Sequence, residues 1–297
     1  MIDSSSESIS FACIPDFVEQ NWLPLTSSQG HSLATYRVRA AEPKGIIFFF
    51  HGYMCSSIEG NRYSFDMAKA GFEVLMMDSV GHGQSGGTKG LLSSYKEIVD
   101  DAVLYVNKVI ELYPGLPVIL SGESMGGTVA LGVSVQVHVD GMFLFNPAFS
   151  SKFASDNSFW SLLGYFCPTL ALPYPPPSDK VSSRNAKVLG ETYGSGMVFF
   201  DFMMAGSVKA MFLCMDQAFS LANLVTTPLV IVAGGRDYVI EEARVKRFYE
   251  EVRSDDKEYW FYPDLHHMVL YEPEYPEIQR RLVEWFSCRF IKPNSTS

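Results

Sequence analysis

The chain alternates between short hydrophobic runs and amphipathic segments over its first half. The runs Gly45–Phe50, Phe72–Met77 and Leu116–Leu120 contain few polar residues, which is typical of strands buried on both faces of a sheet. His31–Arg39 alternates polar and apolar residues instead, as a half-buried strand does. Tyr95–Tyr113 repeats apolar residues at helical spacing. Short strands separated by helices predict a mainly parallel sheet covered by helices on both faces.

The same pattern returns near the C-terminus after a long interruption. Pro228–Ala233 and Glu258–Tyr262 are predicted to be strands, and Tyr275–Phe290 an amphipathic helix. The intervening stretch contains aromatic clusters and a proline-rich turn, and it predicts an inserted, mainly helical cap. We therefore divide the chain into a disordered N-terminal lead (1–18), a first core part (19–147), the cap (148–227) and a second core part (228–292).

Composition and charge narrow the class of function. Hydrophobic residues make up 47% of the chain and charged residues 19%, so a sizeable core can be buried. The 23 basic and 33 acidic residues give a net charge of −10, which disfavours nucleic acid and strong binding to anionic membranes. Five scattered cysteines form no Cys-x-x-Cys pair, so neither a zinc site nor a disulfide framework is predicted. With no signal-peptide pattern and no apolar stretch of about 18 residues, we expect a cytoplasmic protein.

Two serines stand in the pattern Gly-x-Ser-x-Gly. Ser124 directly follows a hydrophobic run, and small residues from Gly126 onward follow it, as the strand–turn–helix geometry of a nucleophile elbow requires. Ser85 lies several residues beyond its strand, in a stretch with the composition of a loop. Val129 to Val139 alternate as a strand would, but the elbow needs a helix there, and a buried helix needs no polar face. We therefore predict Ser124 as a nucleophile followed by a helix.

A serine hydroxyl needs an imidazole to take its proton and a carboxylate to orient that imidazole. In a chain with this kind of elbow the order is serine, acid, histidine. His266 and His267 both lie in a loop after a predicted strand, and these residues alone leave the choice between them open. Asp237 lies in a glycine-rich turn just past a strand end and is the predicted acid. Asp264 is the weaker alternative because it belongs to the histidines' own loop.

The negative charge that develops on a substrate carbonyl oxygen needs fixed N–H donors. Met125, which follows the nucleophile, offers one backbone N–H at a helix N-terminus. The second is predicted at Tyr53, with Met54 as the alternative, in the loop after the first buried strand. This chemistry requires neither a metal nor a cofactor, and we predict none. His51 and His82 each precede a glycine in a turn and are interpreted as structural hydrogen-bonding residues.

Five sequence blocks carry a family resemblance: 51–52, 78–85, 122–127, 227–237 and 267–273. Together and in this order they resemble the monoglyceride lipase and lysophospholipase group of α/β-hydrolases, over roughly residues 22–290. The resemblance implies the α/β-hydrolase fold, with a mostly parallel central sheet flanked by helices. In that group the base stands five residues before a Glu-Pro pair, which selects His267 over His266. The resemblance also implies an acid at Asp237 and oxyanion donors at Tyr53 and Met125.

The cap matches that group poorly beyond its placement, so its own residues carry the prediction about substrate. Its apolar side chains include Phe159, Trp160, Leu163 and Phe166, which are predicted to bind substrate along an acyl tunnel or to dip into a lipid interface. The alternative is that they pack the cap onto the core. A single-chain ester such as a monoacylglycerol or a lysophospholipid fits an apolar pocket. We therefore predict an ester hydrolase whose cap contacts membrane surfaces transiently.

Other functions use the same scaffold. A short-chain carboxylesterase, a thioesterase or an acyltransferase would use the same triad. A peptidase that prefers small N-terminal residues needs a polar or acidic pocket, which the apolar cap disfavours. An epoxide hydrolase or a haloalkane dehalogenase needs aspartate at the nucleophile position, where this chain has Ser124. A catalytically inactive binding protein typically lacks a triad member, and none is missing here. The sequence does not specify an oligomeric state.

Overall fold

The computed structural model describes residues 9–92, 94–150, 157–173 and 182–290. Its core is one sheet of eight strands in the order β1-β4-β6-β5-β7-β8-β11-β12. The pairs β1–β4 and β4–β6 are antiparallel, and every pair from β6 to β12 is parallel. The strands are β1 (Val18–Gln20), β4 (Thr35–Val38), β5 (Gly45–Phe50), β6 (Phe72–Met77), β7 (Val118–Glu123), β8 (Gly141–Phe145), β11 (Leu229–Gly234) and β12 (Lys257–Tyr262). The predicted fold, a mostly parallel sheet flanked by helices, is confirmed.

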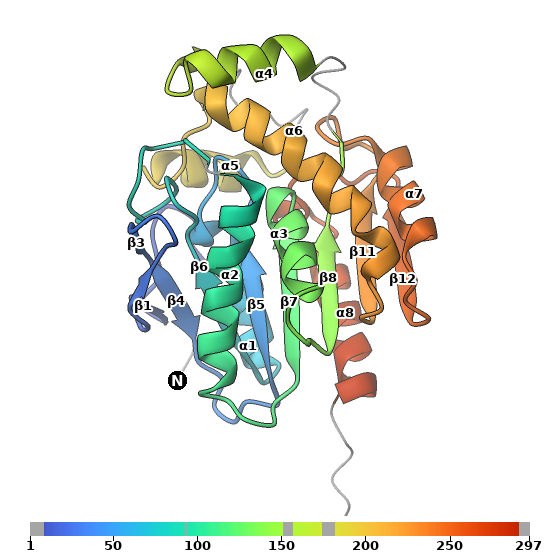
Figure 1. The fold of residues 1–297 in the computed structure, drawn as a ribbon. Coiled ribbons are helices and arrows are strands. Elements are labelled where there is room, and N and C mark those ends of the chain that lie inside the picture. Colours follow the sequence, from blue (N-terminus) through green and yellow to red (C-terminus); the bar gives the residue numbers. More distant parts are fainter. Residues whose placement is uncertain (1–8, 93, 151–156, 174–181, 291–297) are drawn as a thin grey trace, which may run out of the picture.

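Helices cover both faces of this sheet (Figure 1). In that view α2 and α3 lie in front of the strands, whereas α1 and α8 lie behind them. The helices are α1 (Asn61–Lys69), α2 (Tyr95–Ile110), α3 (Met125–Ser134), α4 (Asn157–Phe166), α5 (Ala186–Gly194), α6 (Ala205–Ser220), α7 (Glu242–Glu251) and α8 (Tyr275–Phe290), with 3-10 turns η2 (Ser57–Gly60), η3 (Ala222–Leu224) and η4 (Val269–Tyr271). Two small antiparallel sheets pair β2 (Leu25–Thr26) with β3 (Ser32–Leu33), and β9 (Ala171–Pro173) with β10 (Phe202–Met204).

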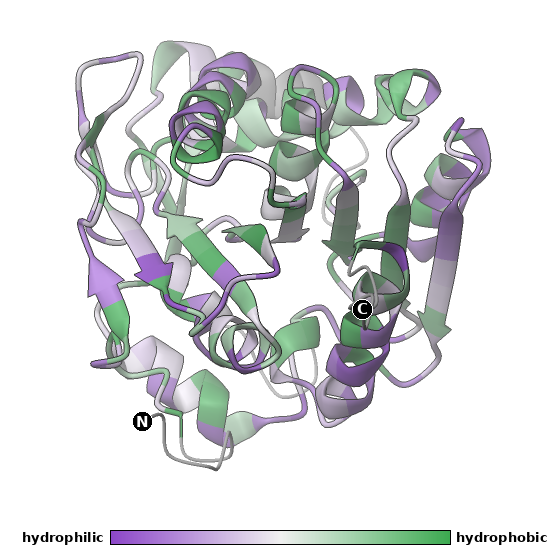
Figure 2. Ribbon diagram, turned by 90° about the horizontal axis from the view of Figure 1, so that it is seen from below, coloured by the Kyte–Doolittle hydropathy of each residue, from purple (hydrophilic) through white to green (hydrophobic). Residues whose placement is uncertain are grey.

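The hydrophobic runs of the sequence become the central strands. All residues of β5, β6, β7, β8 and β11 are buried, whereas the edge strand β12 is largely part-exposed. Figure 2 shows hydrophobic residues along the central strands and bands of hydrophilic residues along the surrounding helices. The helix predicted at Tyr95 begins there because Ser94 and Glu97 form a capping box, in which each side chain accepts from the other's backbone amide.

The segment after β7 is a helix, as the nucleophile elbow requires. The alternation of valines in the sequence, which is typical of a strand, is not reflected in the structure. In α3 every residue from Met125 to Val133 is buried. A helix enclosed on all sides shows no polar face, so alternation of valines carries no information about strand geometry there. The helix ends at Ser134, and Val135 and Val137 follow it outside regular structure.

Residues 9–18, in the predicted N-terminal lead, include one side chain that packs against the core. The Phe11 side chain is only 3% exposed, and its ring lies 4.9 Å from that of Tyr271, centroid to centroid. The Phe11 amide also donates to the Glu191 carboxylate at 3.3 Å. Burial of one aromatic side chain fixes a segment whose polar composition indicates disorder. Phe11 thus ties this part of the chain to the core, residues 1–8 lie outside the described part, and the lead over 1–18 stays a prediction.

Between β8 and β11 the structure describes α4, α5, α6 and the strands β9 and β10. Figure 1 places α4 and α6 above the end of the sheet at which the parallel strands finish. The division of the chain at residues 148 and 227 stays a prediction. Among the described residues, none of the helices combines the length and the apolar character needed to cross a bilayer.

Candidate active site

Ser124 occupies a sharp turn between β7 and α3. Its backbone has a φ of 55° and a ψ of −117°, a conformation that non-glycine residues adopt only under strain. Three backbone hydrogen bonds hold it there: its amide donates to the Phe145 carbonyl, and its carbonyl accepts from the amides of Gly127 and Ala148, all at 3.0–3.1 Å. The side chain thus stands at the carboxyl end of the sheet, as the sequence predicts for a nucleophile elbow.

Glycines bring α3 against the end of β5. A Cβ atom built on Gly126 would lie 1.8 Å from the backbone oxygen of Phe50, and one built on Gly122 would lie 2.2 Å from the oxygen of Gly126. No side chain fits at either position, so these residues allow helix and strand to touch. The first turn of α3 therefore lies beside the loop that follows β5. A Cβ on Gly52 of that loop would lie 3.4 Å from the Cβ of Ser124.

The second Gly-x-Ser-x-Gly serine is structural. The Ser85 hydroxyl donates to the Asp78 carbonyl at 2.6 Å and accepts from the Ala34 amide at 2.8 Å. Both functions of this hydroxyl are therefore used to join two backbone segments. The Asp78 carboxylate accepts from the Gln84 amide at 2.9 Å, so it holds the same turn. Ser85 is not placed to act as a nucleophile.

Asp237 and His267 are brought together. The Asp237 Oδ2 atom lies 2.8 Å from His267 Nδ1, and the Asp237 side chain is buried. Its other oxygen accepts from the amides of Val239 and Ile240, at 2.7 and 2.9 Å, which fixes the direction of the carboxylate. Burial disfavours the imidazolium form of His267, but the charge and hydrogen bond of Asp237 outweigh it, so the pKa of His267 is raised above its ordinary value.

The alternatives from the sequence lie elsewhere. The Nδ1 atom of His266 lies 3.3 Å from the Glu272 carboxylate. Asp264 pairs with Arg236 at 3.1 Å, with both side chains more than half exposed. Neither residue belongs to the Asp237–His267 pair.

Asn146, which the sequence analysis missed, connects the histidine loop to the sheet. Its amide nitrogen donates to the backbone carbonyls of His266 and His267, each at 2.8 Å, and its amide oxygen accepts from the Gly234 amide at 2.8 Å. Asn146 directly follows Phe145, the residue whose carbonyl binds the Ser124 amide. The nucleophile turn and the histidine loop are therefore fastened to neighbouring residues of one strand. A polar residue directly after a buried strand is the signal in the sequence that marks it.

The predicted oxyanion donors flank Ser124. Met125 is the first residue of α3, so its amide has no partner within the helix and points out of the helix N-terminus. Tyr53 follows Gly52 in the loop beside Ser124, and its hydroxyl donates to the Gly90 carbonyl at 2.8 Å. The alternative donor, Met54, has a φ of 67°, and its carbonyl accepts from the Phe199 amide at 3.1 Å. The loop thus contacts the segment between β8 and β11.

The predicted substrate-binding residues all belong to α4. The side chains of Phe159 and Trp160 lie outside the described part of the structure. Leu163 is part-buried, whereas Phe166 is 71% exposed. Leu162 and Tyr165 are also exposed, so α4 presents large apolar side chains outward.

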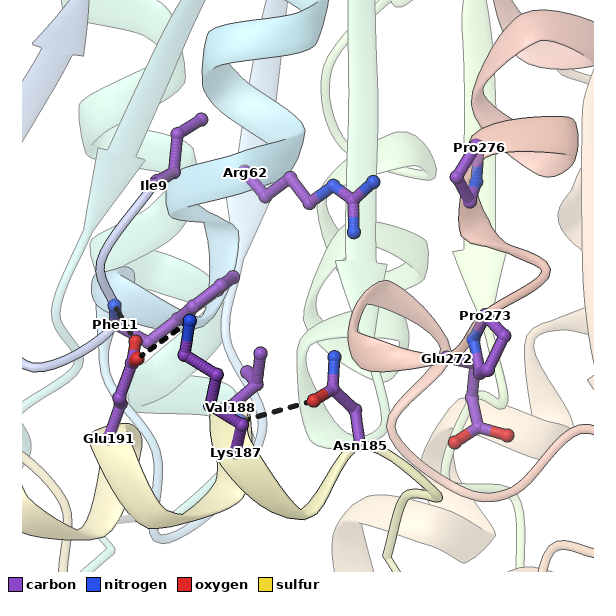
Figure 3. Close-up of a pocket in the computed structure, with 10 residues that line it drawn as sticks. All are labelled: Ile9, Phe11, Arg62, Asn185, Lys187, Val188, Glu191, Glu272, Pro273 and Pro276. Carbon is purple, nitrogen blue, oxygen red and sulfur yellow. Dashed lines mark hydrogen bonds and ion pairs between the residues drawn. The ribbon is translucent and has the colours of Figure 1, made fainter. Parts of the chain in front are cut away.

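A cavity of about 290 Å³ lies away from these residues (Figure 3). It is lined by the N-terminal segment at Phe11, by Arg62 of α1, by Lys187 and Glu191 of α5, and by Glu272 after η4. None of the predicted catalytic residues lines it. Over the ranges that the structure describes, no group of three or more His, Cys, Asp or Glu side chains is arranged to hold a metal ion.

The family model described as "serine aminopeptidase, S33" matches residues 41–274 of this chain. Among curated proteins, the monoacylglycerol lipase of Mycolicibacterium smegmatis is 27% identical over 249 residues, covering 82% of this chain and 88% of that protein. The human monoglyceride lipase is 28% identical over 307 residues, covering 95% of this chain and 96% of that protein. Among solved structures, a soluble variant of the Saccharomyces cerevisiae monoglyceride lipase superposes with a TM-score of 0.82 at 15% identity, covering 97% of this chain and 99% of that one, which supports the fold.

Proposed function

Since this chain belongs to the serine aminopeptidase family of α/β-hydrolases, we propose that it hydrolyses carboxylic esters through an acyl-enzyme, with Ser124 as nucleophile, His267 as base and Asp237 as the orienting acid. The observation that carries this proposal is the 2.8 Å contact between His267 Nδ1 and buried Asp237, in a loop fastened beside the Ser124 elbow.

The proposed reaction proceeds in two halves. The Asp237 carboxylate accepts from His267 Nδ1, which leaves Nε2 free to take the Ser124 proton while Oγ bonds to the ester carbonyl carbon. The amides of Tyr53 and Met125 stabilise the resulting oxyanion. His267 then gives the proton to the departing alcohol, and the acyl group stays on Ser124. A water molecule, deprotonated by His267, releases the acid and restores the serine.

The relatives' names favour an acylglycerol as the substrate. Two curated relatives that cover most of this chain act on monoacylglycerol by name, whereas the family description names an aminopeptidase. An aminopeptidase needs a carboxylate to bind the substrate's α-amino group, and the described side chains of α4 are apolar instead. We therefore propose a monoacylglycerol or lysophospholipid as the substrate. A short-chain ester or a thioester as the substrate would use the same residues. So would an acyl transfer in which an alcohol replaces water as the acceptor.

The outward face of α4 supports contact with a lipid surface. Leu162, Tyr165 and Phe166 are exposed, and Lys209 lies over the Tyr165 ring at 5.5 Å, where it can reach lipid head groups. We propose that this face of α4 docks transiently on substrate aggregates. A double Tyr165→Ser and Phe166→Ser variant should then lose activity on dispersed long-chain substrate but not on a soluble short ester. Equal loss on both substrates would contradict this role.

The experiment that tests the reaction compares wild type, Ser124→Ala and Ser85→Ala. Each is assayed on monoacylglycerols, lysophospholipids, short p-nitrophenyl esters and an aminoacyl amide, with and without an added acceptor alcohol. Loss of the nucleophile should lower kcat on the order of 10³-fold or more. Ser85→Ala is the matched control from the other Gly-x-Ser-x-Gly and should retain activity. Full activity of Ser124→Ala would refute the proposal, and a preference for the amide would replace the ester assignment.

A further inference from the structure

Two carboxyl groups meet in the interior behind the nucleophile. Glu59 of η2 and Glu123, the last residue of β7, are 2% and 0% exposed. A Cβ atom built on Gly52 would lie 3.5 Å from Glu59 Oε1 and 3.6 Å from the Glu123 backbone oxygen, so the two residues approach each other across Gly52. Within the described ranges neither forms an ion pair with lysine or arginine. Two buried carboxyls without a cation are costly to retain, and the proposed triad uses neither of them.

Their remaining contacts reach all three segments of the proposed site. Glu59 Oε2 accepts from the Gly52 amide at 2.7 Å, next to the oxyanion donor Tyr53. Glu123 Oε1 accepts from the Val269 amide at 2.5 Å, two residues beyond the base His267. Glu123 is itself the residue before the nucleophile. The pair therefore connects the oxyanion loop, the elbow and the histidine loop through side chains.

The contacts also locate a proton. Glu123 Oε2 is buried, and no donor among the described residues reaches it. Two ionised carboxylates here would repel each other in a medium of low dielectric constant. A proton on Glu123 Oε2, donated to Glu59, removes both problems. Burial and the neighbouring Glu59 charge raise the pKa of Glu123 well above its usual value, and burial also raises the pKa of Glu59.

We propose that Glu59 and Glu123 share one proton and act as a positioning pair, which fastens the three catalytic segments and places a single negative charge behind His267. This inference rests on the proposed function, because it assigns Glu59 and Glu123 a task in that reaction. The charge acts on the base: together with Asp237, Glu59 raises the pKa of His267. It thus stabilises the imidazolium that forms when Ser124 loses its proton.

Three other titratable groups, His51, Cys55 and Tyr271, lie around the pair. His51 Nε2 accepts from the Ser79 amide at 3.0 Å while Nδ1 lies 2.7 Å from the Gly52 carbonyl, so both ring nitrogens have backbone partners. Burial and the carboxyl pair raise the pKa of the Cys55 thiol and that of the Tyr271 hydroxyl well above their usual values. Among the proposed catalytic residues, His267 is the one whose pKa the charge of Glu59 raises.

Counting charges gives a sharp test. Glutamine keeps the shape and the hydrogen bonds of a protonated carboxyl group. Glu123→Gln leaves the charge on Glu59, and Glu59→Gln moves it to Glu123, so each single variant keeps one negative charge. The double variant has none. Glu73→Gln is the matched control. Glu73 is also a buried carboxyl, but it lies near the start of β6, whereas Glu123 lies at the end of β7.

The expected pH profiles of kcat and kcat/KM follow from that count. Both single variants should keep the acid limb of wild type, because each retains one negative charge near His267. Both should lose the alkaline limb, because neither has a shared proton that can leave at high pH. The double variant moves the acid limb to lower pH and lowers kcat about tenfold with little change in KM. Leucine at position 123 cannot accept the hydrogen bond from the Val269 amide, whereas glutamine can. Glu123→Leu should therefore lower kcat, and Glu123→Gln should retain it. If either single variant moves the acid limb as far as the double variant does, the two carboxyls share no proton.

A readout independent of activity separates this inference from the proposed function. The infrared carbonyl band of a protonated carboxyl group should be present in wild type and Glu73→Gln at neutral pH, and absent from both single variants. Absence of the band from wild type would overturn the shared proton. An inactive wild type that shows the band would refute ester hydrolysis and leave the shared proton standing.

Discussion

Replacing Gly126 with alanine would test whether contact between α3 and β5 sets the geometry of the proposed site. The added Cβ would lie 1.8 Å from the Phe50 backbone oxygen, where real Cβ contacts essentially never fall below 3.0 Å. Helix and strand must therefore separate by about 1.2 Å, the difference between these two distances. The Phe50 carbonyl cannot rotate away because β5 is paired on both sides, with β6 and with β7.

The magnitude follows from what must move. Overpacking a core costs about 1–3 kcal/mol when side chains can adjust, and here the obstacle is backbone, so we expect about 3 kcal/mol or more in the free energy of unfolding. The separation occurs between the Met125 amide and the start of the loop that carries Tyr53. A misplacement of about 1 Å at such donors lowers kcat on the order of 10²-fold.

The assay is a denaturant titration together with steady-state kinetics. Gly190→Ala is the control, because a Cβ at that position of α5 meets nothing within 4 Å. Alanine at that helix position should stabilise the protein by about 1 kcal/mol and leave kcat unchanged. If Gly126→Ala matches wild type in both midpoint and kcat, the close contact does not determine the site geometry, and the reasoning is refuted.

Three further outcomes are expected. The acid limb of kcat/KM should have its midpoint above pH 6.5, because the base must be neutral and the pKa of His267 is raised. Asp237→Asn should lower that midpoint and reduce kcat about 10⁴-fold. An unmoved midpoint would contradict the pairing of Asp237 with His267. His266→Gln should keep kcat close to wild type because His266 faces Glu272, so a loss as large as that of His267→Gln would reassign the base. Phe11→Ala should lower the free energy of unfolding by about 3 kcal/mol, measured by denaturant titration, and an unchanged midpoint would mean that the N-terminal segment contributes nothing to the core.

The parts of the fold that the sequence predicted depend on local pattern. Buried parallel strands are short apolar runs, and the strands at Gly45 and Phe72 begin and end where those runs do. The elbow was recognisable because the strand must lead directly into the serine. The third strand was predicted over Leu116–Leu120, but it begins two residues later, at Val118, and continues through Ser121 to Glu123. Its polar residues make tertiary contacts, such as the hydrogen bond that the Ser121 hydroxyl donates to the Phe48 carbonyl, and a pattern along the chain does not show such contacts.

What the sequence did not show depends on contacts between distant segments. Phe11 is buried against Tyr271, some 260 positions away, so its own neighbours in sequence indicate disorder. Glu123 stands at the variable position before the nucleophile, where an acidic residue suggests exposure. Its partner Glu59 is brought to it only by the packing of η2 against β5 and β6. The cap side chains depend in the same way on what they face.

The strained backbone of Ser124 affects which variants of this protein would be recovered by selection for stability. A residue other than glycine at a φ of 55° and a ψ of −117° costs about 1–3 kcal/mol. Glycine at position 124 would relieve that cost and remove the hydroxyl at the same time. A library of variants sorted for heat resistance alone would therefore enrich glycine at the very position that the reaction needs. Any programme to stabilise this chain must select for turnover as well, because at this residue stability and turnover favour different amino acids.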